Sequence, residues 1–232
     1  MNKPLLSIFK SLCCPAGKAD GAGRPRLRRK EDRPGELVVA ALELFVERGY
    51  AATRLDDVAA RAGVTKGTLY LYYENKEALF KAVVAHNMVP LIDEARKRSE
   101  SHQGSMSSLL QDMLLGWWEQ IGATTVGGIL KLIVSEAGNF PEAAAYYHAS
   151  VIVPARELIG QVIRRGMDSG EFRPVNAEVC FHVIFAPLLM LVLWRNSFSV
   201  CGQDVDHEEY LKTAIEFSLA GLRRQEKDGK ES

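Results

Sequence analysis

One stretch of the chain decides its fold: residues 53–73 read TRLDDVAARAGVTKGTLYLYY. The pattern predicts a helix, a tight turn and a second helix. Val58 lies on the inner face of the first helix, and Gly63 lies where the turn needs a left-handed residue. Thr53 and Thr65 are the predicted N-caps of the two helices, and Leu69 points back to the core. This is the spacing of a helix-turn-helix motif.

The outward positions of the second helix carry polar side chains. Lys66, Thr68, Tyr70 and Tyr72 can all form hydrogen bonds, which suits phosphate oxygens and base edges. Gly67 among them leaves room for a close backbone approach. The alternative is an ordinary corner between two helices, but a buried corner would favour apolar residues at these positions. The pattern therefore favours DNA binding.

The distribution of charge supports this interpretation. The 232 residues carry 29 basic and 29 acidic side chains, so the net charge is zero. Residues 1–35 hold nine Lys or Arg against three Asp or Glu, whereas residues 83–232 hold fourteen against nineteen. Upstream of the motif, residues 15–35 read PAGKADGAGRPRLRRKEDRPG. We expect a flexible basic arm there that contacts the DNA backbone or a minor groove.

The rest of the chain has helical periodicity, with no alternating strand and no internal repeat, so the predicted fold class is all-α. Asn75 is a predicted N-cap, Pro90 is expected to end or kink the helix that follows it, and Pro154 to kink a longer one. Outside the motif, the predicted helices cover residues 36–49, 75–90, 106–121, 126–136, 141–168, 176–194 and 206–224.

Residues 41–84 read ALELFVERGYAATRLDDVAARAGVTKGTLYLYYENKEALFKAVV. The GY pair before Thr53, the AxxAGV turn, the KGTLY helix and the KEAL start of the next helix make this stretch resemble the DNA-binding domain of the TetR/AcrR family of bacterial repressors. The resemblance implies a homodimer with a three-helix reading domain and a variable helical ligand-binding body. It also implies that the last two helices form a four-helix dimer interface and that a small molecule releases the operator.

The resemblance assigns DNA contacts residue by residue. Thr53 matches a phosphate contact, Tyr72 a contact to phosphate or base, and Lys76 a clamp on the DNA backbone. The chain departs from the common pattern at Leu71, where His or Tyr is frequent, and at residues 74–75, where Pro-Ser is frequent. The full predicted DNA-binding set is Thr53, Thr65, Lys66, Gly67, Thr68, Tyr70, Tyr72 and Lys76.

The predicted domain organisation has four parts. Residues 1–33 form the flexible basic arm and residues 34–83 the helix-turn-helix DNA-binding domain. Residues 84–226 form a helical ligand-binding and dimerisation domain, and residues 227–232 a polar tail.

The predicted dimer interface combines residues 176–194 with residues 206–224, on which Leu211, Ile215, Leu219 and Leu222 can form one apolar stripe. Residues 179–194 are the most apolar run of the chain. This run is too short to span a bilayer comfortably, so a buried or interface helix is favoured over a membrane hairpin and no membrane partner is expected.

Aromatic and polar side chains of the body suggest an apolar pocket for an unidentified effector. The alternative for each is an ordinary place in the core or interface. No catalytic residues, metal site or cofactor are predicted, because no nucleophile is paired with a base and the histidines lack metal-ligand spacing. The candidate ligand-binding residues are Met113, Trp117, Trp118, Tyr147, His148, His182 and Phe185.

The predicted function is that of a ligand-responsive homodimeric repressor that binds a pseudo-palindromic double-stranded DNA operator. The scattered cysteines are typical of reduced thiols in the cytoplasm, where the protein would join the nucleoid when bound to DNA. Two alternatives stay open, a ligand-independent DNA-binding factor on the same scaffold and a helical protein-interaction module.

Overall fold

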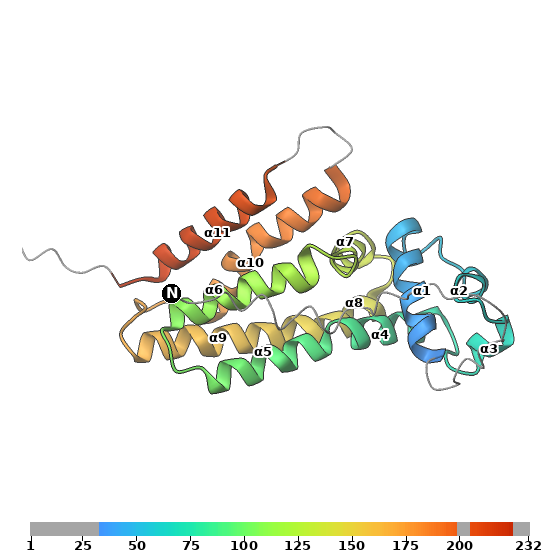
Figure 1. Ribbon diagram of the computed structural model, residues 1–232, viewed down its shortest axis with the longest axis horizontal. Helices are drawn as coiled ribbons and strands as arrows, with labels where there is room; N and C mark the ends of the chain where they lie inside the picture. Colours follow the sequence, from blue (N-terminus) through green and yellow to red (C-terminus); the bar gives the residue numbers. More distant parts are fainter. Residues whose placement is uncertain (1–32, 199–204, 225–232) are drawn as a thin grey trace, which may run out of the picture. The chain divides into compact units, whose positions relative to one another are not determined.

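The computed structural model describes residues 33–198 and 205–224, so most of the predicted basic arm and all of the polar tail lie outside the described residues (Figure 1). The described part is helical, apart from an isolated bridge between Phe172 and Arg223. Its α-helices are α1 (Arg33–Arg48), α2 (Leu55–Arg61), α3 (Lys66–Tyr70), α4 (Lys76–Asn87), α5 (Val89–Ser101), α6 (Met106–Trp117), α7 (Gly127–Glu136), α8 (Pro141–Tyr147), α9 (Val153–Asp168), α10 (Ala177–Leu193) and α11 (His207–Leu222). Three π-helical segments extend them: η4 (Trp118–Gly122), η5 (His148–Ile152) and η6 (Trp194–Phe198).

Several predicted helix boundaries are confirmed by their caps. The Asn75 side chain accepts a hydrogen bond of 2.8 Å from the Ala78 amide at the start of α4. Pro90 lies in the first turn of α5, so the chain leaves α4 before it. Asn176 and Asp206 cap α10 and α11 in the same way, each accepting from two backbone amides of the first turn.

The long helix predicted over residues 141–168 is interrupted. α8, η5 and α9 follow one another with helical backbone angles at both junctions, and η5 ends immediately before α9. Pro154 has no amide hydrogen, so the carbonyl group of Ser150 has no partner four residues ahead. A wider π-helical turn therefore precedes Pro154 where only a kink was predicted.

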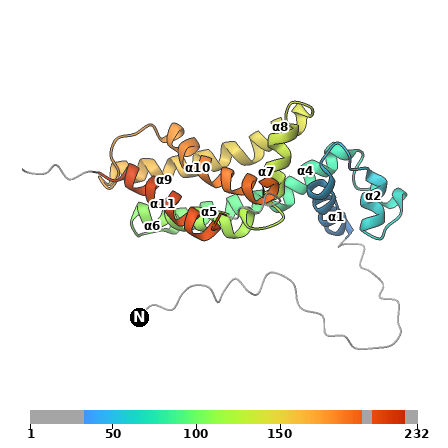
Figure 2. The ribbon, with the colours of Figure 1, turned by 90° about the horizontal axis from the view of Figure 1, so that it is seen from above.

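The body of the protein is built around α10. α10 packs against α9 on one side and α11 on the other, and its N-terminal half carries the stacked rings of Phe181 and Phe185 at 5.4 Å (Figures 1 and 2). The predicted interface stripe on α11 faces inward, and this prediction is wrong because these side chains complete the core of the same chain. The stripe consists of Leu211, Ile215, Leu219 and Leu222, each at most 5% exposed.

The apolar run of α10 is longer than predicted. α10 and η6 together, Ala177–Phe198, are long and apolar enough to cross a membrane by length and composition alone. One such helix is weak evidence for a membrane span, and α7, α9 and α11 pack on this one.

Polar contacts fix the ends of the body helices. The Glu171 carboxylate accepts from the Met106 and Ser107 amides at 2.7 and 2.8 Å and so caps α6 from a distant part of the chain. Burial opposes ionisation of Glu171, but the hydrogen bonds from Ser107 and Met106 outweigh it and lower its pKa. On α9, Arg165 donates to the carbonyl groups of Ser99 and His102, which ties down the end of α5.

The first three helices meet the body through a close contact between α1 and α7. Gly128 on α7 lies so near Val46 on α1 that a Cβ atom at position 128 would be 2.5 Å from a Val46 methyl carbon. Only glycine allows the two helices to approach this closely.

This contact gives a test of the packing. Gly128→Ala is expected to lower the free energy of unfolding by about 1–3 kcal/mol, because the added methyl group must displace Val46 or the helix itself. Chemical denaturation measures the change. The matched control is Gly138→Ala, where a Cβ atom meets nothing within 4 Å, and equal destabilisation by both variants would contradict the close contact.

Candidate nucleic-acid interface

The turn between α2 and α3 has the geometry predicted from the sequence. Gly63 adopts φ +66°, the left-handed region that glycine enters at little cost. The Val64 amide donates to the Ala59 carbonyl at 2.9 Å, which closes the turn. The small, buried Ala59 lets the two helices cross, so the helix-turn-helix prediction is confirmed here.

α3 is held by one cap and one anchor. The Thr65 hydroxyl accepts from the Thr68 amide at 3.2 Å, as predicted for an N-cap. Leu69 is fully buried and points into the core, which leaves Lys66, Tyr70 and Tyr72 on the outer side, with the two tyrosines 45% and 40% exposed. These three predicted DNA contacts therefore lie on the exposed side of the motif.

Lys66 is already engaged by neighbours on this surface. Its ammonium group lies 2.9 Å from an Asp56 carboxylate oxygen and 5.8 Å from the centre of the Tyr70 ring. The hydrogen bond to Asp56 raises the pKa of Lys66, so the side chain stays cationic. Since both partners are largely exposed, a phosphate or base edge can replace Asp56.

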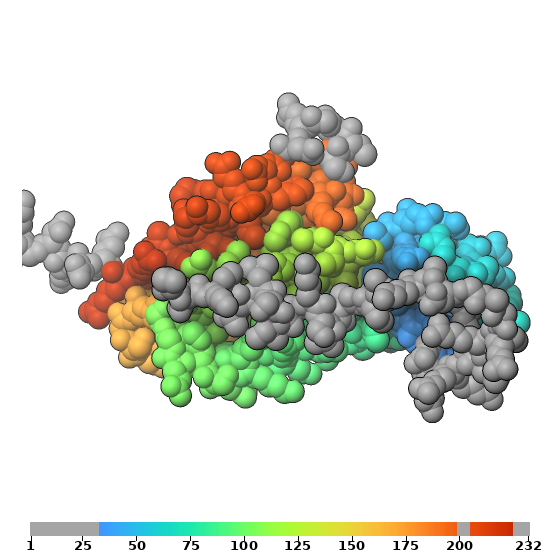
Figure 3. All heavy atoms as spheres, in the orientation of Figure 1, coloured from blue at the N-terminus to red at the C-terminus, as the bar shows by residue number. Residues whose placement is uncertain are grey.

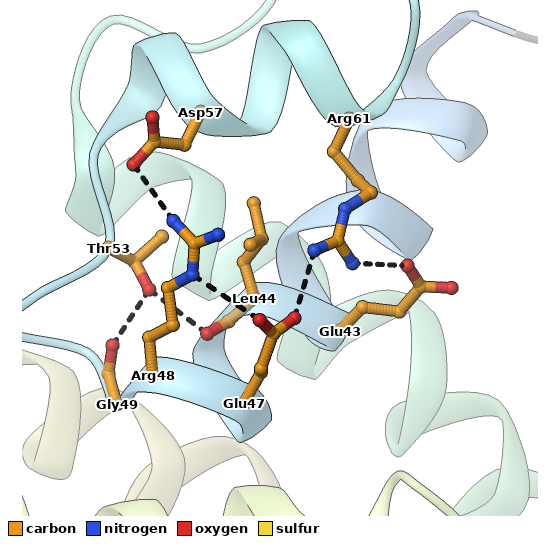
Figure 4. A network of polar contacts seen from close by, with 8 residues as sticks. All are labelled: Glu43, Leu44, Glu47, Arg48, Gly49, Thr53, Asp57 and Arg61. Atoms are coloured by element: carbon orange, nitrogen blue, oxygen red, sulfur yellow. Dashed lines mark hydrogen bonds and ion pairs between the residues drawn. The ribbon is translucent and has the colours of Figure 1, made fainter.

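Thr53 does not occupy the predicted position. Arg54 takes the N-cap position of α2 without a side-chain bond, and Thr53 is 2% exposed. The Thr53 hydroxyl donates toward the carbonyl groups of Gly49 (2.7 Å) and Leu44 (3.1 Å), so it fastens the end of α1 to the loop before α2 (Figure 4). The capping prediction is wrong, and the hydroxyl is turned away from the surface predicted to contact phosphate.

Lys76 also points inward, contrary to the clamp on DNA predicted for it. Its ammonium group donates to the carbonyl groups of Tyr50, Ala51 and Thr53 at 2.7, 3.0 and 3.2 Å. It also lies 4.6 Å from the centre of the Tyr50 ring. Burial lowers its pKa, opposed by the charge of Glu136. Lys76 therefore clamps the chain's own backbone.

Ion pairs between α1 and α2 occupy two other cations of the motif (Figure 4). Arg61 contacts Glu47 at 2.9 Å and Glu43 at 3.0 Å, and Arg48 contacts Asp57 at 3.3 Å. These pairs join the two helices and leave the arginines committed to carboxylates.

Arg54 is a candidate that the sequence reasoning missed. It is exposed at the head of α2, and among the described residues no ion pair holds its side chain. Its charge lies near enough to Lys66 to oppose the rise in the pKa of that residue. The sequence could have indicated Arg54 as a DNA contact, because it is a basic residue at the predicted start of α2. The prediction instead assigned the DNA contact at this position to the neighbouring Thr53.

The seven candidate ligand-binding residues differ in burial. Trp118 and Tyr147 are buried, and burial raises the pKa of Tyr147. The Trp117 and Phe185 rings pack edge to face at 4.6 Å. His148 and His182 are exposed, so neither side chain is enclosed within the described part of the chain, and their ligand contacts stay predictions. Met113 is half-buried against the core.

The described part of the chain contains a groove and a small hollow, and none of the seven residues lines either. A groove of about 610 Å³ lies between α10 and α11, lined by Val183, Pro187, Tyr210 and Phe217 among others. A hollow of about 10 Å³ lies beside Tyr50 and Phe140. Within residues 33–198 and 205–224, no three His, Cys, Asp or Glu side chains are grouped so that they could hold a metal ion.

The fold and the exposed helix α3 define a helix-turn-helix regulator, and comparison with protein families gives the family. Residues 37–83 match the model for bacterial regulatory proteins of the tetR family, and residues 100–206 match the tetracyclin repressor-like C-terminal domain. The chain belongs to the TetR family. Its members are DNA-binding transcriptional regulators and not enzymes.

Individual proteins that resemble this chain are also transcriptional regulators or share its fold. The transcriptional activator FasR of Mycolicibacterium smegmatis is 39% identical over 83 residues, which is 36% of each chain, so the match spans about a third of that relative's length. The transcriptional repressor KstR2 of Rhodococcus jostii is 24% identical over 81% of this chain and 91% of its own. The SmeT–triclosan complex has a TM-score of 0.70 at 20% identity over 86% of this chain and 94% of that one.

The inward role of Lys76 can be separated from a DNA contact. Lys76→Met is expected to lower the free energy of unfolding by about 1–3 kcal/mol, because three carbonyl groups lose a charged donor. Lys66→Met, at an exposed position, is expected to leave thermal stability nearly unchanged. Calorimetry measures the melting temperature of both variants. An unchanged melting temperature for Lys76→Met would contradict the inward role and favour the predicted clamp of Lys76 on the DNA backbone.

Proposed function

We propose that the protein is a homodimeric repressor that binds a pseudo-palindromic DNA operator and is released by a small apolar or aromatic effector. The observation that carries the proposal is α3, whose buried Leu69 fixes a helix with Lys66, Tyr70 and Tyr72 on its outer side. Such a helix fits the major groove, with its polar side chains against base edges and phosphates.

The proposed DNA surface consists of Thr65, Lys66, Gly67, Thr68, Tyr70 and Tyr72, to which we add Arg54. Gly67 supports this choice. A Cβ atom there would meet only the Thr65 hydroxyl oxygen, at 3.9 Å, so the protein itself has room for a larger residue. A glycine that the fold does not require suits a position where DNA approaches the backbone.

The proposed dimer interface is the outer face of α10 and α11 (Figure 3). Large apolar side chains are exposed there: Phe217 (75%), Val183 (66%), Val179 (56%) and Met190 (44%). Exposed apolar side chains that border a groove are typical of protein interfaces. A second copy, related by a two-fold axis, would cover these residues and place two α3 helices for half-sites about one helical turn, roughly 34 Å, apart. A membrane is the disfavoured occupant, because α10 packs between α9 and α11.

An apolar effector suits the aromatic side chains of the body, with Trp117, Trp118 and Phe185 as the retained candidates. The structural neighbour SmeT was solved with triclosan, which supports an effector of this kind. For release, the effector must bind the DNA-incompetent conformation better, by about 10⁴-fold for a nearly complete switch. A ligand-independent DNA-binding factor would show no such response.

We propose that the protein represses transcription rather than activating it. Its proposed location is the cytoplasm, where it joins the nucleoid when bound to DNA. The relatives carry both directions in their names, FasR as an activator and KstR2 as a repressor. KstR2 matches most of this chain, whereas the FasR match covers 36% of it, so repression is the better supported direction.

DNA binding is tested by gel shift on duplexes recovered from a random-sequence library by in vitro selection. Lys66→Ala and Tyr70→Ala are each expected to weaken binding at least tenfold, because each dimer loses two contacts. Lys66→Ala should also reduce the dependence of log affinity on log salt by about 2 if the lysine contacts phosphate in both half-sites.

Lys97→Ala is the control, because this exposed lysine lies on α5 away from the proposed surface. Affinity equal to the parent in both α3 variants would exclude the recognition surface. Absence of any salt-sensitive DNA binding by the folded parent would instead favour the protein-interaction module.

The interface is tested by Phe217→Glu, which places a charge on the most exposed large side chain beside the groove. We expect sedimentation analysis to show a dimer for the parent and a monomer for the variant, with operator binding lost together with the dimer. Val39→Glu, at a 53% exposed position on α1, should remain dimeric. A Phe217→Glu variant that stays dimeric would place the interface elsewhere.

A further inference from the structure

One side chain at the C-terminal end of α3, that of the C-cap residue Leu71, is left unexplained by the polar surface. Leu71 is 83% exposed, more than any other large apolar residue that the structure describes. Tyr70 and Tyr72 flank it, both partly exposed. Leucine at this position contributes nothing to the core, so packing does not account for it.

Backbone geometry fixes the direction of this side chain. Leu71 has helical angles, φ −68° and ψ −25°, and its amide donates to the Gly67 carbonyl at 3.3 Å. Two residues along an α-helix correspond to a rotation of about 200°. Because Leu69 points into the core at 0% exposure, Leu71 points almost directly away from it.

The outermost line of the helix is therefore free of hydrogen-bonding groups. Gly67 lies one turn before Leu71 on the same side and has no side chain, so nothing shields the approach to Leu71 from that direction. Thr68 and Tyr70 lie on either side of this line. An apolar group thus occupies the most exposed position at the C-terminal end of α3.

We propose that Leu71 reads the 5-methyl group of a thymine in each half-site, an inference that rests on the proposed DNA-binding function. In the major groove, thymine is the base that presents a methyl group, whereas the other base edges present hydrogen-bond donors and acceptors. A leucine side chain cannot form hydrogen bonds with the donors and acceptors of the base edges. Its contact with thymine removes the 5-methyl group of that base from water. Leu71 therefore selects thymine by apolar contact, while the polar side chains beside it select other positions.

The test compares two forms of the same duplex. Duplexes selected by the parent protein are synthesised with thymidine or with deoxyuridine, which lacks the methyl group, at each T in turn. The parent is expected to prefer thymidine about fourfold per half-site at one position, the effect of burying one methyl group. Leu71→Ala should bind both forms equally at that position, and Val134→Ala, an exposed apolar residue on α7, should keep the preference.

The outcomes separate this inference from the function on which it rests. Equal binding of the two forms by the parent, or a preference retained in Leu71→Ala, overturns the role of Leu71 while DNA binding stands. If Leu71→Ala instead abolishes association between copies and leaves the thymine preference intact, the residue belongs to a protein contact. A folded parent that selects no duplex at all refutes the DNA-binding function, and the inference with it.

Discussion

The ammonium group of Lys76 holds together the region where the DNA-reading helices meet the body. It bonds to three carbonyl groups of the segment between α1 and α2, and it lies 4.6 Å from the Tyr50 ring and 5.9 Å from the Phe140 ring. Tyr50 and Phe140 themselves pack edge to face at 4.5 Å. One charge at the start of α4 thereby fixes the loop before α2 and the beginning of α8, so the orientation of the helix-turn-helix motif depends on it.

Cations of the motif fall into two groups with different tasks. Arg48 and Arg61 are committed to carboxylates that join α1 to α2, and Lys76 is committed to backbone carbonyl groups. Arg54 and Lys66 are exposed beside the proposed DNA surface, where Lys66 pairs with the exposed carboxylate of Asp56. A near-neutral domain can therefore still present positive charge to DNA, because several of its carboxylates pair with Arg48 and Arg61 between α1 and α2 and do not neutralise Arg54.

The sequence predicted the features that depend on local chemistry. Gly63, the Thr65 cap, the buried Leu69 and the break at Pro90 follow from backbone preferences of single residues, and all are confirmed. Thr53 and Lys76 were misassigned because their polar groups are satisfied by carbonyl groups from other segments, which spacing alone does not reveal. The prediction that the apolar stripe of α11 lies in a dimer interface was wrong for a related reason. Periodicity shows that a helix has an apolar face, but not whether that face meets its own chain or a second one.

The approach of α7 to α1 at Gly128 has an evolutionary consequence. Position 128 and position 46 share one volume, filled by the two methyl groups of Val46. Any side chain gained at 128 must be offset by atoms lost at 46, so the two positions are expected to change together in descendants of this sequence. The pair thus forms a coupled sequence signature of the junction between the reading helices and the body.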